Sequence, residues 1–396
     1  MEPVGRLDHM VRRLTFSSST STHRTRLRQA GFNTSIPKMK HILTFIAVLA
    51  SIVTLGQNKF ADFTRHKRFI ELRTGICMKY IDTGKLSGPQ LLLLHGYTDT
   101  SRSFQLLIEN LRRANKDLRI LAPDLRGHGE TSMPDAMACK YDPKKCFTPK
   151  LFAEDVIDLM DQLCIDKIHV AGHSMGSIIA QELALNYPDR IASITLIETF
   201  VDGSACEAIQ DFLIADLIET DYRCILEEKF NAKWPSDAYS ILPMNMGEAI
   251  QTYLRENWVV EALAAEDFLD VVFHETIKIP LGTWIGAIES LGEIDYRSAL
   301  ENLKIPTQIL WSTQDVVTSA KDQVLVKSAF QSATKSNGTK VIYKTYGKLP
   351  VPPPGYPMND LGHNVHWAAP KEVADDIYSF ITNGYDIYQP STNPCE

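Results

Sequence analysis

The sequence lacks the short patterns that bind metals and nucleotides. It contains no C-x-x-C, no H-E-x-x-H, no P-loop and no G-x-G-x-x-G after a strand. Zinc sites and cradles for nucleotide phosphates depend on such spacings. His363 and His366 lie three residues apart but complete none of these patterns. We therefore expect neither a metal ion nor a cofactor.

Long apolar runs, internal repeats and positive charge are also scarce. The apolar run at residues 42–55 has 14 residues, whereas a membrane-spanning helix needs about 20. The net charge is −7, and the first 41 residues hold eight Lys/Arg but two Asp/Glu. An acidic remainder argues against nucleic-acid binding. The sequence thus predicts no nucleic-acid partner and no stable membrane span.

The N-terminal residues 1–56 have the composition of a targeting region. Residues 1–38 are rich in Arg, Ser and Thr, which is typical of a transit peptide or of an over-extended gene start. Lys40 then precedes the short apolar run, which closes at Gly56, so residues 39–56 resemble a secretory signal peptide. We expect a protein that is secreted or in the endomembrane lumen. The alternative is a membrane-anchored or mitochondrial protein, in which residues 1–38 would be a genuine part of the translated chain.

Seven cysteines fit an oxidising compartment. Cys139 and Cys146 flank a short polar loop, and Cys206 and Cys224 lie 18 residues apart in a helical segment. Both spacings allow local disulfides, which persist in secreted proteins. The cysteines in apolar contexts, expected to be buried free thiols, are Cys77 and Cys164.

Strand and helix signals alternate from Phe69 onward. Such alternation favours a mostly parallel sheet covered by helices on both faces. The expected strands lie within residues 90–96, 119–129, 167–176, 192–199 and 306–315. Reacting groups in such sheets gather at the carboxyl ends of the strands. The polar residues at these ends are His95, Asp124, Ser174, Glu198 and Asp315.

The stretch "VAGHSMGS" places a serine between two glycines at the end of an apolar run. A serine on a sharp strand-to-helix turn needs neighbours almost without side chains, and Gly172 and Gly176 meet that need. Ser174 is therefore a candidate nucleophile. A small residue in a tight turn is the alternative that this stretch alone leaves open.

Five successive segments resemble landmarks of the α/β-hydrolase superfamily: "LLLHGYTDTSRSF", "APDLRGHGETS", "VAGHSMGS", "LWSTQD" and "GHNVHW". The resemblance spans roughly residues 69–385 and is closest to the branch with haloperoxidase-like, esterase and epoxide-hydrolase proteins. It implies a mostly parallel eight-stranded sheet with helices on both faces and a helical cap. Ser174 stands where the epoxide hydrolases and haloalkane dehalogenases of that branch carry aspartate, so those two chemistries are disfavoured.

The resemblance also implies how the chain is divided. A first part of the core would span residues 57–199, a helical cap 200–304, and the second part of the core 305–396. The cap residues that are candidates for an apolar ceiling are Trp234, Met244, Met246, Tyr253, Trp258, Phe273 and Trp284. Most residues of this kind are expected to pack cap helices onto the core instead.

Chemical roles follow from what a serine nucleophile needs. A serine hydroxyl requires a general base, itself oriented by an acid, and the order serine, acid, histidine along the chain suits this fold. The resemblance selects His363 as base and Asp315 as acid, with Glu198 as the alternative acid. His366 is expected to pack rather than react.

An oxyanion hole needs two backbone N–H groups aimed at the developing negative charge. The N–H groups of Tyr97, directly after "HG", and of Met175, directly after the candidate nucleophile, are the expected donors.

The sequence therefore predicts a serine hydrolase that cleaves a hydrophobic small-molecule ester or lactone through an acyl-enzyme. A ligand-binding protein of the same fold, a C–C bond hydrolase and a perhydrolase are the alternatives. The sequence does not define the substrate or an oligomeric state.

Overall fold

The structure is a computed structural model that describes residues 63–84, 88–114, 117–347 and 360–383. Residues 1–65 and 66–396 form two separate units, and every element discussed below belongs to the second. The predicted targeting region 1–56, with its signal peptide at 39–56, lies outside the described residues. In the part of the chain that is described, no helix has the length and apolar character needed to cross a membrane.

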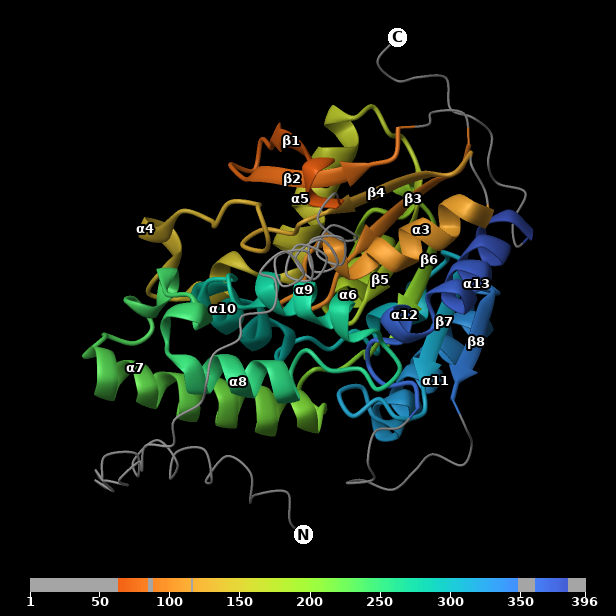
Figure 1. Ribbon diagram of the computed structural model, residues 1–396. Coiled ribbons are helices and arrows are strands. Elements are labelled where there is room, and N and C mark those ends of the chain that lie inside the picture. Colours follow the sequence, from red (N-terminus) through yellow and green to blue (C-terminus); the bar gives the residue numbers. More distant parts are fainter. Residues whose placement is uncertain (1–62, 85–87, 115–116, 348–359, 384–396) are drawn as a thin grey trace, which may run out of the picture. The chain divides into compact units, whose positions relative to one another are not determined.

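Eight strands form one mostly parallel sheet (Figure 1). They lie in the order β1-β2-β4-β3-β5-β6-β7-β8, with β1 and β2 antiparallel to their neighbours and the others parallel. The strands are β1 (Arg68–Glu71), β2 (Cys77–Asp82), β3 (Gln90–Leu94), β4 (Arg119–Pro123), β5 (Ile168–His173), β6 (Ile191–Ile197), β7 (Thr307–Ser312) and β8 (Val341–Tyr346). The predicted fold class is confirmed.

The central strands are buried on both faces, as their continuous apolar sequences predict. Every residue of β5 and β7 is buried, and Leu91 to Leu94 of β3 are almost completely inaccessible. The edge strand β8 instead alternates between exposed and less exposed residues. The core thus centres on β3, β5 and β7, whose carboxyl ends carry the candidate site.

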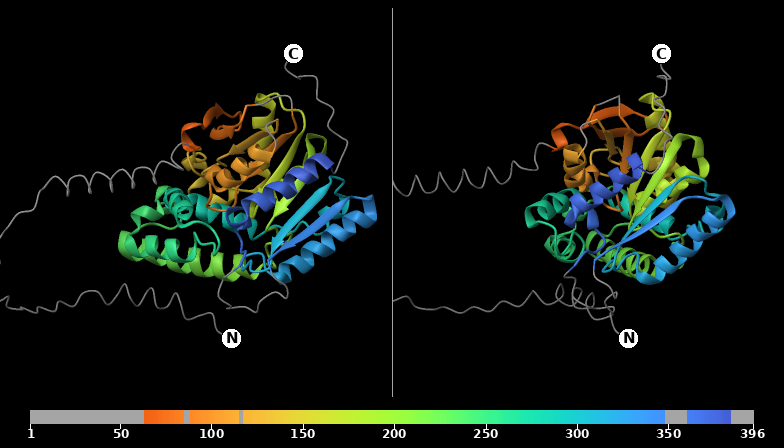
Figure 2. Two further views of the ribbon diagram at one scale, coloured as in Figure 1. Left: turned by 45° about the vertical axis from the view of Figure 1, so that its right-hand side comes forward. Right: turned by 90° about the vertical axis from the view of Figure 1, so that its right-hand side faces the viewer.

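Helices cover both faces of the sheet (Figure 2). On one face α3 packs against α13, and on the other α5 packs against α6. The helices of the core are α3 (Gln105–Ala114), α5 (Pro149–Gln162), α6 (Met175–Asn186), α11 (Ala320–Asn337), α12 (Val365–Ala368) and α13 (Pro370–Asn383). Because the strands from β3 to β8 are parallel, α3, α5, α6 and α11 make crossovers between successive strands, whereas α12 and α13 follow β8.

Between β6 and β7 the chain forms a group of helices, η4 to α10, that we call the helical cap (Figure 1). The cap helices are η4 (Ala208–Tyr222), α7 (Arg223–Phe230), α8 (Glu248–Asn257), α9 (Glu266–Thr276) and α10 (Leu281–Leu291). The first is a π-helix, a form that usually occurs as a single turn and often near functional sites. α7 ends at Asn231, which takes the left-handed conformation typical of a helix C-cap.

The cysteines differ in part from the sequence prediction. Cys139 and Cys146 form a disulfide with their Cα atoms 5.9 Å apart. The predicted Cys206–Cys224 disulfide is wrong, because both are free thiols. The π-helix lies between them and keeps them at opposite ends of a helical segment, beyond the roughly 7 Å that a disulfide can bridge.

The other two assignments also need correction. Cys164 is disulfide-bonded and half-buried, so it is not the buried free thiol that its apolar neighbours predict. Cys77 is free but half-buried rather than buried. The apolar local sequence therefore predicted the free thiol of Cys77 correctly, but it did not reveal the bonding of Cys164 or the partial exposure of either residue.

Alkylation of the natively produced, unreduced protein under denaturing conditions tests this pattern. Cys77, Cys206 and Cys224 should be alkylated, because they are free thiols, whereas Cys139 and Cys146 should react only after reduction. Peptide mass mapping reads each site separately. Alkylation of Cys139 and Cys146 before reduction would contradict the structure.

Candidate active site

Ser174 lies on a strained turn between β5 and α6. Its φ is +49° and its ψ is −117°, a backbone conformation that residues other than glycine rarely adopt. A Cβ on Gly172 would lie 2.1 Å from the carbonyl oxygen of Gly176, and a Cβ on Gly176 would lie 2.0 Å from that of Leu94. Only glycine fits at these two positions, so the close packing of the turn explains the glycines that flank Ser174.

His363 and Asp315 are brought together from segments 48 residues apart. The Nδ1 atom of His363 lies 3.0 Å from each carboxylate oxygen of Asp315. Asp315 follows β7, and its Oδ1 also accepts from the backbone N–H groups of Val317 (2.7 Å) and Thr318 (2.9 Å). These amides fix the carboxylate, which in turn fixes the imidazole ring.

The interaction between Asp315 and His363 favours the charged form of each side chain, although burial disfavours it. Burial alone raises the pKa of Asp315. The charge and hydrogen bond of His363, together with hydrogen bonds from Glu198 and Thr318, outweigh this effect. The net pKa of Asp315 is therefore well below the usual range. Burial lowers the pKa of His363, and the charge and hydrogen bond of Asp315 reverse that effect, so the net pKa is raised. Asp315 therefore stabilises an imidazolium at His363.

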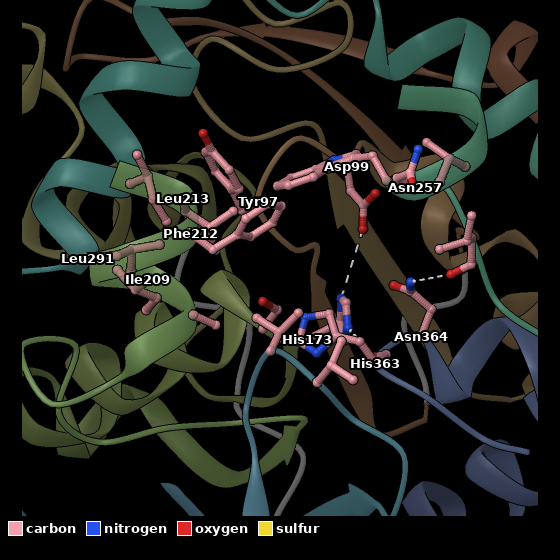
Figure 3. A pocket seen from close by; sticks show the side chains of 18 of the residues that line it. Tyr97, Asp99, His173, Ile209, Phe212, Leu213, Asn257, Leu291, His363 and Asn364 are labelled. Atoms are coloured by element: carbon pink, nitrogen blue, oxygen red, sulfur yellow. Dashed lines mark hydrogen bonds and ion pairs between the residues drawn. The ribbon is translucent and has the colours of Figure 1, made fainter. Parts of the chain in front are cut away.

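Ser174 and His363 both line one cavity of about 180 Å³ (Figure 3). Asp315 lies buried behind His363. The other walls are mainly apolar, and the cap supplies Ile209, Phe212, Leu213, Trp258, Ile288 and Leu291. The cavity therefore joins two reactive side chains to an apolar space beneath the cap.

One of the candidates for the apolar ceiling lines the cavity. Among the seven residues, all within the described part of the chain, Trp258 lines it and the other six do not. Trp284 packs against Trp258, with their ring centres 5.2 Å apart. The cavity wall combines aromatic side chains with aliphatic ones from η4 and α10.

His173 and Asp99 form a second polar group on the cavity wall. His173 Nε2–H donates to the carbonyl oxygen of His363 at 2.8 Å, and burial lowers the pKa of His173 to about 3, so the ring is neutral. Its Nδ1 lies 3.9 Å from Asp99 Oδ2 (Figure 3). Burial raises the pKa of Asp99 to about 7, while Ser103 donates to it at 3.0 Å. Asp99 lies within the segment "LLLHGYTDTSRSF", but the sequence pattern assigns it no role.

Glu198 lies beside Asp315 rather than at His363. It is fully buried at the end of β6, and its Oε2 accepts from the backbone N–H of Ser312 at 3.1 Å. Within the described residues no hydrogen bond joins Glu198 to His363, whose Nδ1 is engaged by Asp315. Of the two candidate acids, Asp315 is the one in contact with the histidine.

Glu261 reaches the histidine loop from the cap. Its Oε1 accepts from the backbone N–H of Gly362 at 3.0 Å, and its Oε2 accepts from that of Asn364 at 2.9 Å. The two amides flank His363. No sequence signal points to Glu261, because it lies about a hundred residues before the loop that it holds.

The two candidate oxyanion donors lie at the same end of the sheet as Ser174. Met175 is the first residue of α6, so its N–H is one of the helix N-terminal groups without an intrahelical acceptor. Tyr97 follows β3, its ring lines the cavity, and its hydroxyl donates to the carbonyl oxygen of Trp284 at 2.7 Å.

The other polar residues singled out in the sequence support loops. Leu125 N–H donates to His95 Nε2 at 2.9 Å, and Asp124 forms an ion pair with Lys67 at 2.8 Å. His366 is fully buried, with its Nε2 2.8 Å from Ser103 Oγ. Among the described residues, no cluster of three or more His, Cys, Asp or Glu side chains is arranged to hold a metal ion.

Comparison with known proteins assigns the family. The profile of the α/β-hydrolase fold family matches residues 89–347, so the chain belongs to this family. This confirms the resemblance inferred from the sequence motifs and supports the assignment of a hydrolase enzyme.

Individual relatives are distant. The chain is 22% identical to bifunctional epoxide hydrolase 2 of Sus scrofa over 188 residues. This aligned region covers 47% of this chain and 31% of the relative. Over 130 residues, 33% of this chain and 43% of the relative, it is 30% identical to a putative 2-succinyl-6-hydroxy-2,4-cyclohexadiene-1-carboxylate synthase of Bacillus subtilis. The chain thus spans less than half the length of these curated relatives.

Solved structures share the fold. A thermophilic esterase from Thermogutta terrifontis superposes with a TM-score of 0.54 at 20% identity, covering 80% of this chain and 98% of the esterase. An epoxide hydrolase from Vigna radiata gives 0.55 at 21% identity, covering 80% and 97%. At such identities the likeness concerns the fold alone.

Replacement of Asp315 by asparagine should lower the pKa of His363. The substitution removes the negative charge that raises this pKa and leaves the burial that lowers it. A titration of the His363 ring protons by NMR measures the effect in wild-type and variant protein. An unchanged or higher pKa in Asp315→Asn would contradict the electrostatic coupling; Asp267→Asn, an exposed change on α9, is the control.

Proposed function

We propose that the protein is a serine hydrolase that cleaves a carboxylic ester or lactone of a small hydrophobic molecule. The observation that carries this proposal is the shared cavity. Ser174, on its strained turn, and His363, bonded through Nδ1 to Asp315, line the same apolar space. Nucleophile, base and orienting acid are the parts that acyl transfer by serine requires.

In the proposed first half-reaction, Ser174 Oγ attacks the substrate carbonyl carbon while Nε2 of His363 accepts the hydroxyl proton. Asp315 keeps the proton of His363 on Nδ1 and stabilises the imidazolium that forms. His363 then donates its Nε2 proton to the leaving alkoxide, which departs as the alcohol, or stays attached if the substrate is a lactone. The product of this half-reaction is an acyl-enzyme on Ser174.

In the second half-reaction, water attacks the acyl carbon and gives a proton to His363 Nε2. Ser174 leaves as the alkoxide and recovers that proton, which releases the carboxylic acid. In both halves the carbonyl oxygen becomes negative, and we propose that the N–H groups of Tyr97 and Met175 stabilise it. Each such donor typically contributes about 10²–10³ to the rate.

The size and lining of the cavity support a small, apolar acyl group or ring. Its volume of about 180 Å³ is similar to the roughly 150 Å³ of an engineered apolar cavity that accommodates benzene. Ile209 and Leu213 of η4 and Leu291 of α10 lie together on one side of this space (Figure 3), and Ile288 also lines it. An apolar group would leave few buried polar atoms unpaired there.

The identity of Ser174 also helps to choose between ester hydrolysis and the alternative functions of this fold. The names of several relatives record epoxide hydrolases, but a serine at the turn after β5 favours acyl transfer over epoxide opening by a carboxylate. C–C bond hydrolysis and perhydrolysis would use the same three side chains. Ligand binding without turnover would not need them.

We also propose that the chain matures in an oxidising compartment, in line with the expectation of a secreted or lumenal protein. The Cys139–Cys146 disulfide and the disulfide-bonded Cys164 support this, because such bonds are rare in reducing compartments. Fully reduced cysteines in natively produced protein would argue against it.

A fluorophosphonate probe tests the nucleophile. The probe should label Ser174, and Ser174→Ala should abolish labelling and ester turnover while folding remains nearly unchanged, because the substitution removes only the attacking oxygen. Intact-protein mass measurement and peptide mapping read the adduct. Ser332→Ala, a change on α11, should label as wild type does. Labelling of Ser174→Ala at the wild-type rate would refute the assignment, and labelling without turnover of any ester or lactone would favour ligand binding.

A series of p-nitrophenyl esters tests the size limit. Acetate and butyrate should be cleaved with higher kcat/KM than decanoate, because a long chain exceeds the cavity. Leu213→Ala should shift the preference towards longer chains by enlarging the wall at η4. Leu263→Ala, an exposed cap position outside the cavity wall, is the matched control. A wild-type preference for decanoate would overturn the proposed substrate size.

A further inference from the structure

Two buried glutamates lie directly behind the acid and the base of the site. Glu198 lies against Asp315, and Glu261 holds the two amides on either side of His363. We propose that both are positioning residues with opposite charge states: Glu198 is a neutral acid that donates a hydrogen bond to Asp315, whereas Glu261 is a carboxylate that accepts from the histidine loop. This inference rests on the proposed function of the site.

One carboxyl oxygen of Glu198 has a hydrogen-bond donor and the other has none. Oε2 accepts from Ser312 N–H at 3.1 Å, but Oε1 is fully buried and receives no hydrogen bond from the described residues. A buried polar atom without a partner is rare and costly. The group beside it, Asp315, is itself a carboxylate and offers no proton. A proton on Glu198 turns this contact between two acceptors into a hydrogen bond.

The surroundings of Glu198 favour its neutral form. Burial raises its pKa well above the ordinary value, and the negative charge of Asp315 raises it further. Two phenols of β8 interact with it only through its charge: the hydroxyl of Tyr343 donates to Gln323 and that of Tyr346 donates to Asp376. Burial raises the pKa of both phenols, so they stay neutral. No lysine or arginine in the described part of the chain forms a salt bridge with Glu198. Asp315 already accepts hydrogen bonds from Nδ1–H of His363 and from two backbone N–H groups, which makes Asp315 the member that stays ionised.

The contacts of Glu261 require the opposite state. Both oxygens accept from backbone N–H groups, at 3.0 Å from Gly362 and 2.9 Å from Asn364. A proton on either oxygen would point at an N–H group. The net pKa of Glu261 is raised, with burial as the largest cause and Asp315 adding to it, while these two hydrogen bonds and the nearby charge of His363 limit the rise. The carboxylate thus holds the loop and adds a second negative charge near the imidazole.

The same substitution should therefore have different effects at the two positions. In Glu198→Gln, the amide N–H can donate to Asp315 and the amide oxygen can accept from Ser312, so every hydrogen bond and the net charge are kept. In Glu261→Gln, one amide oxygen replaces two acceptors, and the NH₂ group faces a backbone N–H. The second variant also loses the negative charge near His363.

The experiment is a comparison of pH profiles. For wild type, Glu198→Gln and Glu261→Gln, kcat/KM for a short p-nitrophenyl ester is measured from acidic to neutral pH. Glu198→Gln should lose less than about tenfold in rate and keep the acid limb in place, since neither a charge nor a hydrogen bond is lost. Glu261→Gln should lower kcat by about 10–100-fold, as for a lost hydrogen bond to a charged group, and move its acid limb to lower pH.

Two further variants isolate the causes. Glu198→Leu has a similar size but no donor, and it should lose about tenfold or more relative to Glu198→Gln. Glu261→Asp keeps the charge and should recover part of the acid-limb position that Glu261→Gln loses. Glu256→Gln, at an exposed position on α8, controls for the loss of a cap carboxylate and should match wild type. Thermal unfolding of each variant shows whether it is folded at the assay temperature.

An NMR readout makes the inference independent of turnover. The deshielded resonance of the His363 Nδ1 proton, hydrogen-bonded to Asp315, should persist in Glu198→Gln and shift or broaden in Glu261→Gln. An acid limb that moves to lower pH in Glu198→Gln would show that Glu198 is ionised. A wild-type pH profile and resonance in Glu261→Gln would show that the histidine loop does not need the Glu261 carboxylate. Either result overturns the proposal. Failure of the wild type to react with esters and fluorophosphonate would instead reject the proposed function, while the resonance still reports on both glutamates.

Discussion

The close approach of the Ser174 turn to β3 is the constraint on which the site depends. Gly176 lies so near the carbonyl oxygen of Leu94 that a Cβ would come within 2.0 Å of it, and Gly172 is packed as tightly against Gly176 itself. This contact holds Ser174 at a positive φ and starts α6 at the next residue. The strain is maintained because the surrounding sheet is fully buried and cannot relax around it. The serine hydroxyl therefore faces the space that the histidine loop and the cap enclose.

Around this turn, the structure controls charge mainly by burial. Burial lowers the pKa of His173 and His366 and so keeps both rings neutral, although they lie next to His363. His363 alone among these three has a carboxylate hydrogen-bonded to its Nδ1, and its pKa is raised instead. The contrast shows how neighbouring residues of one type acquire different properties: each imidazole is desolvated, but one has a charged partner that compensates for the lost water. Among these three rings, positive charge is thus confined to His363.

The cap contributes to the site in a way that its position along the chain does not suggest. Its aliphatic residues from η4 and α10 form the cavity wall, while Glu261, between α8 and α9, bonds the backbone beside His363. Substrate access and the placement of the histidine therefore involve the same group of helices. A displacement of the segment that carries Glu261 would remove two hydrogen bonds from the histidine loop.

The sequence alone predicted the fold class and the tight turn at Ser174, because both follow from local patterns. Continuous apolar runs specify strands buried on both faces, and the glycines around Ser174 specify a turn that tolerates no side chain. Local patterns did not decide the partner of His363, since Asp315 and Glu198 both end strands of the same sheet; the register of β6 and β7 placed one at the ring and the other behind it. They also suggested a Cys206–Cys224 bond that the intervening helix excludes, and seven candidates for a ceiling of which one, Trp258, lines the cavity. Glu261 gave no signal, and Asp99 lies in a motif that assigned it no role. A side chain's burial and partners depend on segments far away in the chain, and only the tertiary structure brings those segments together.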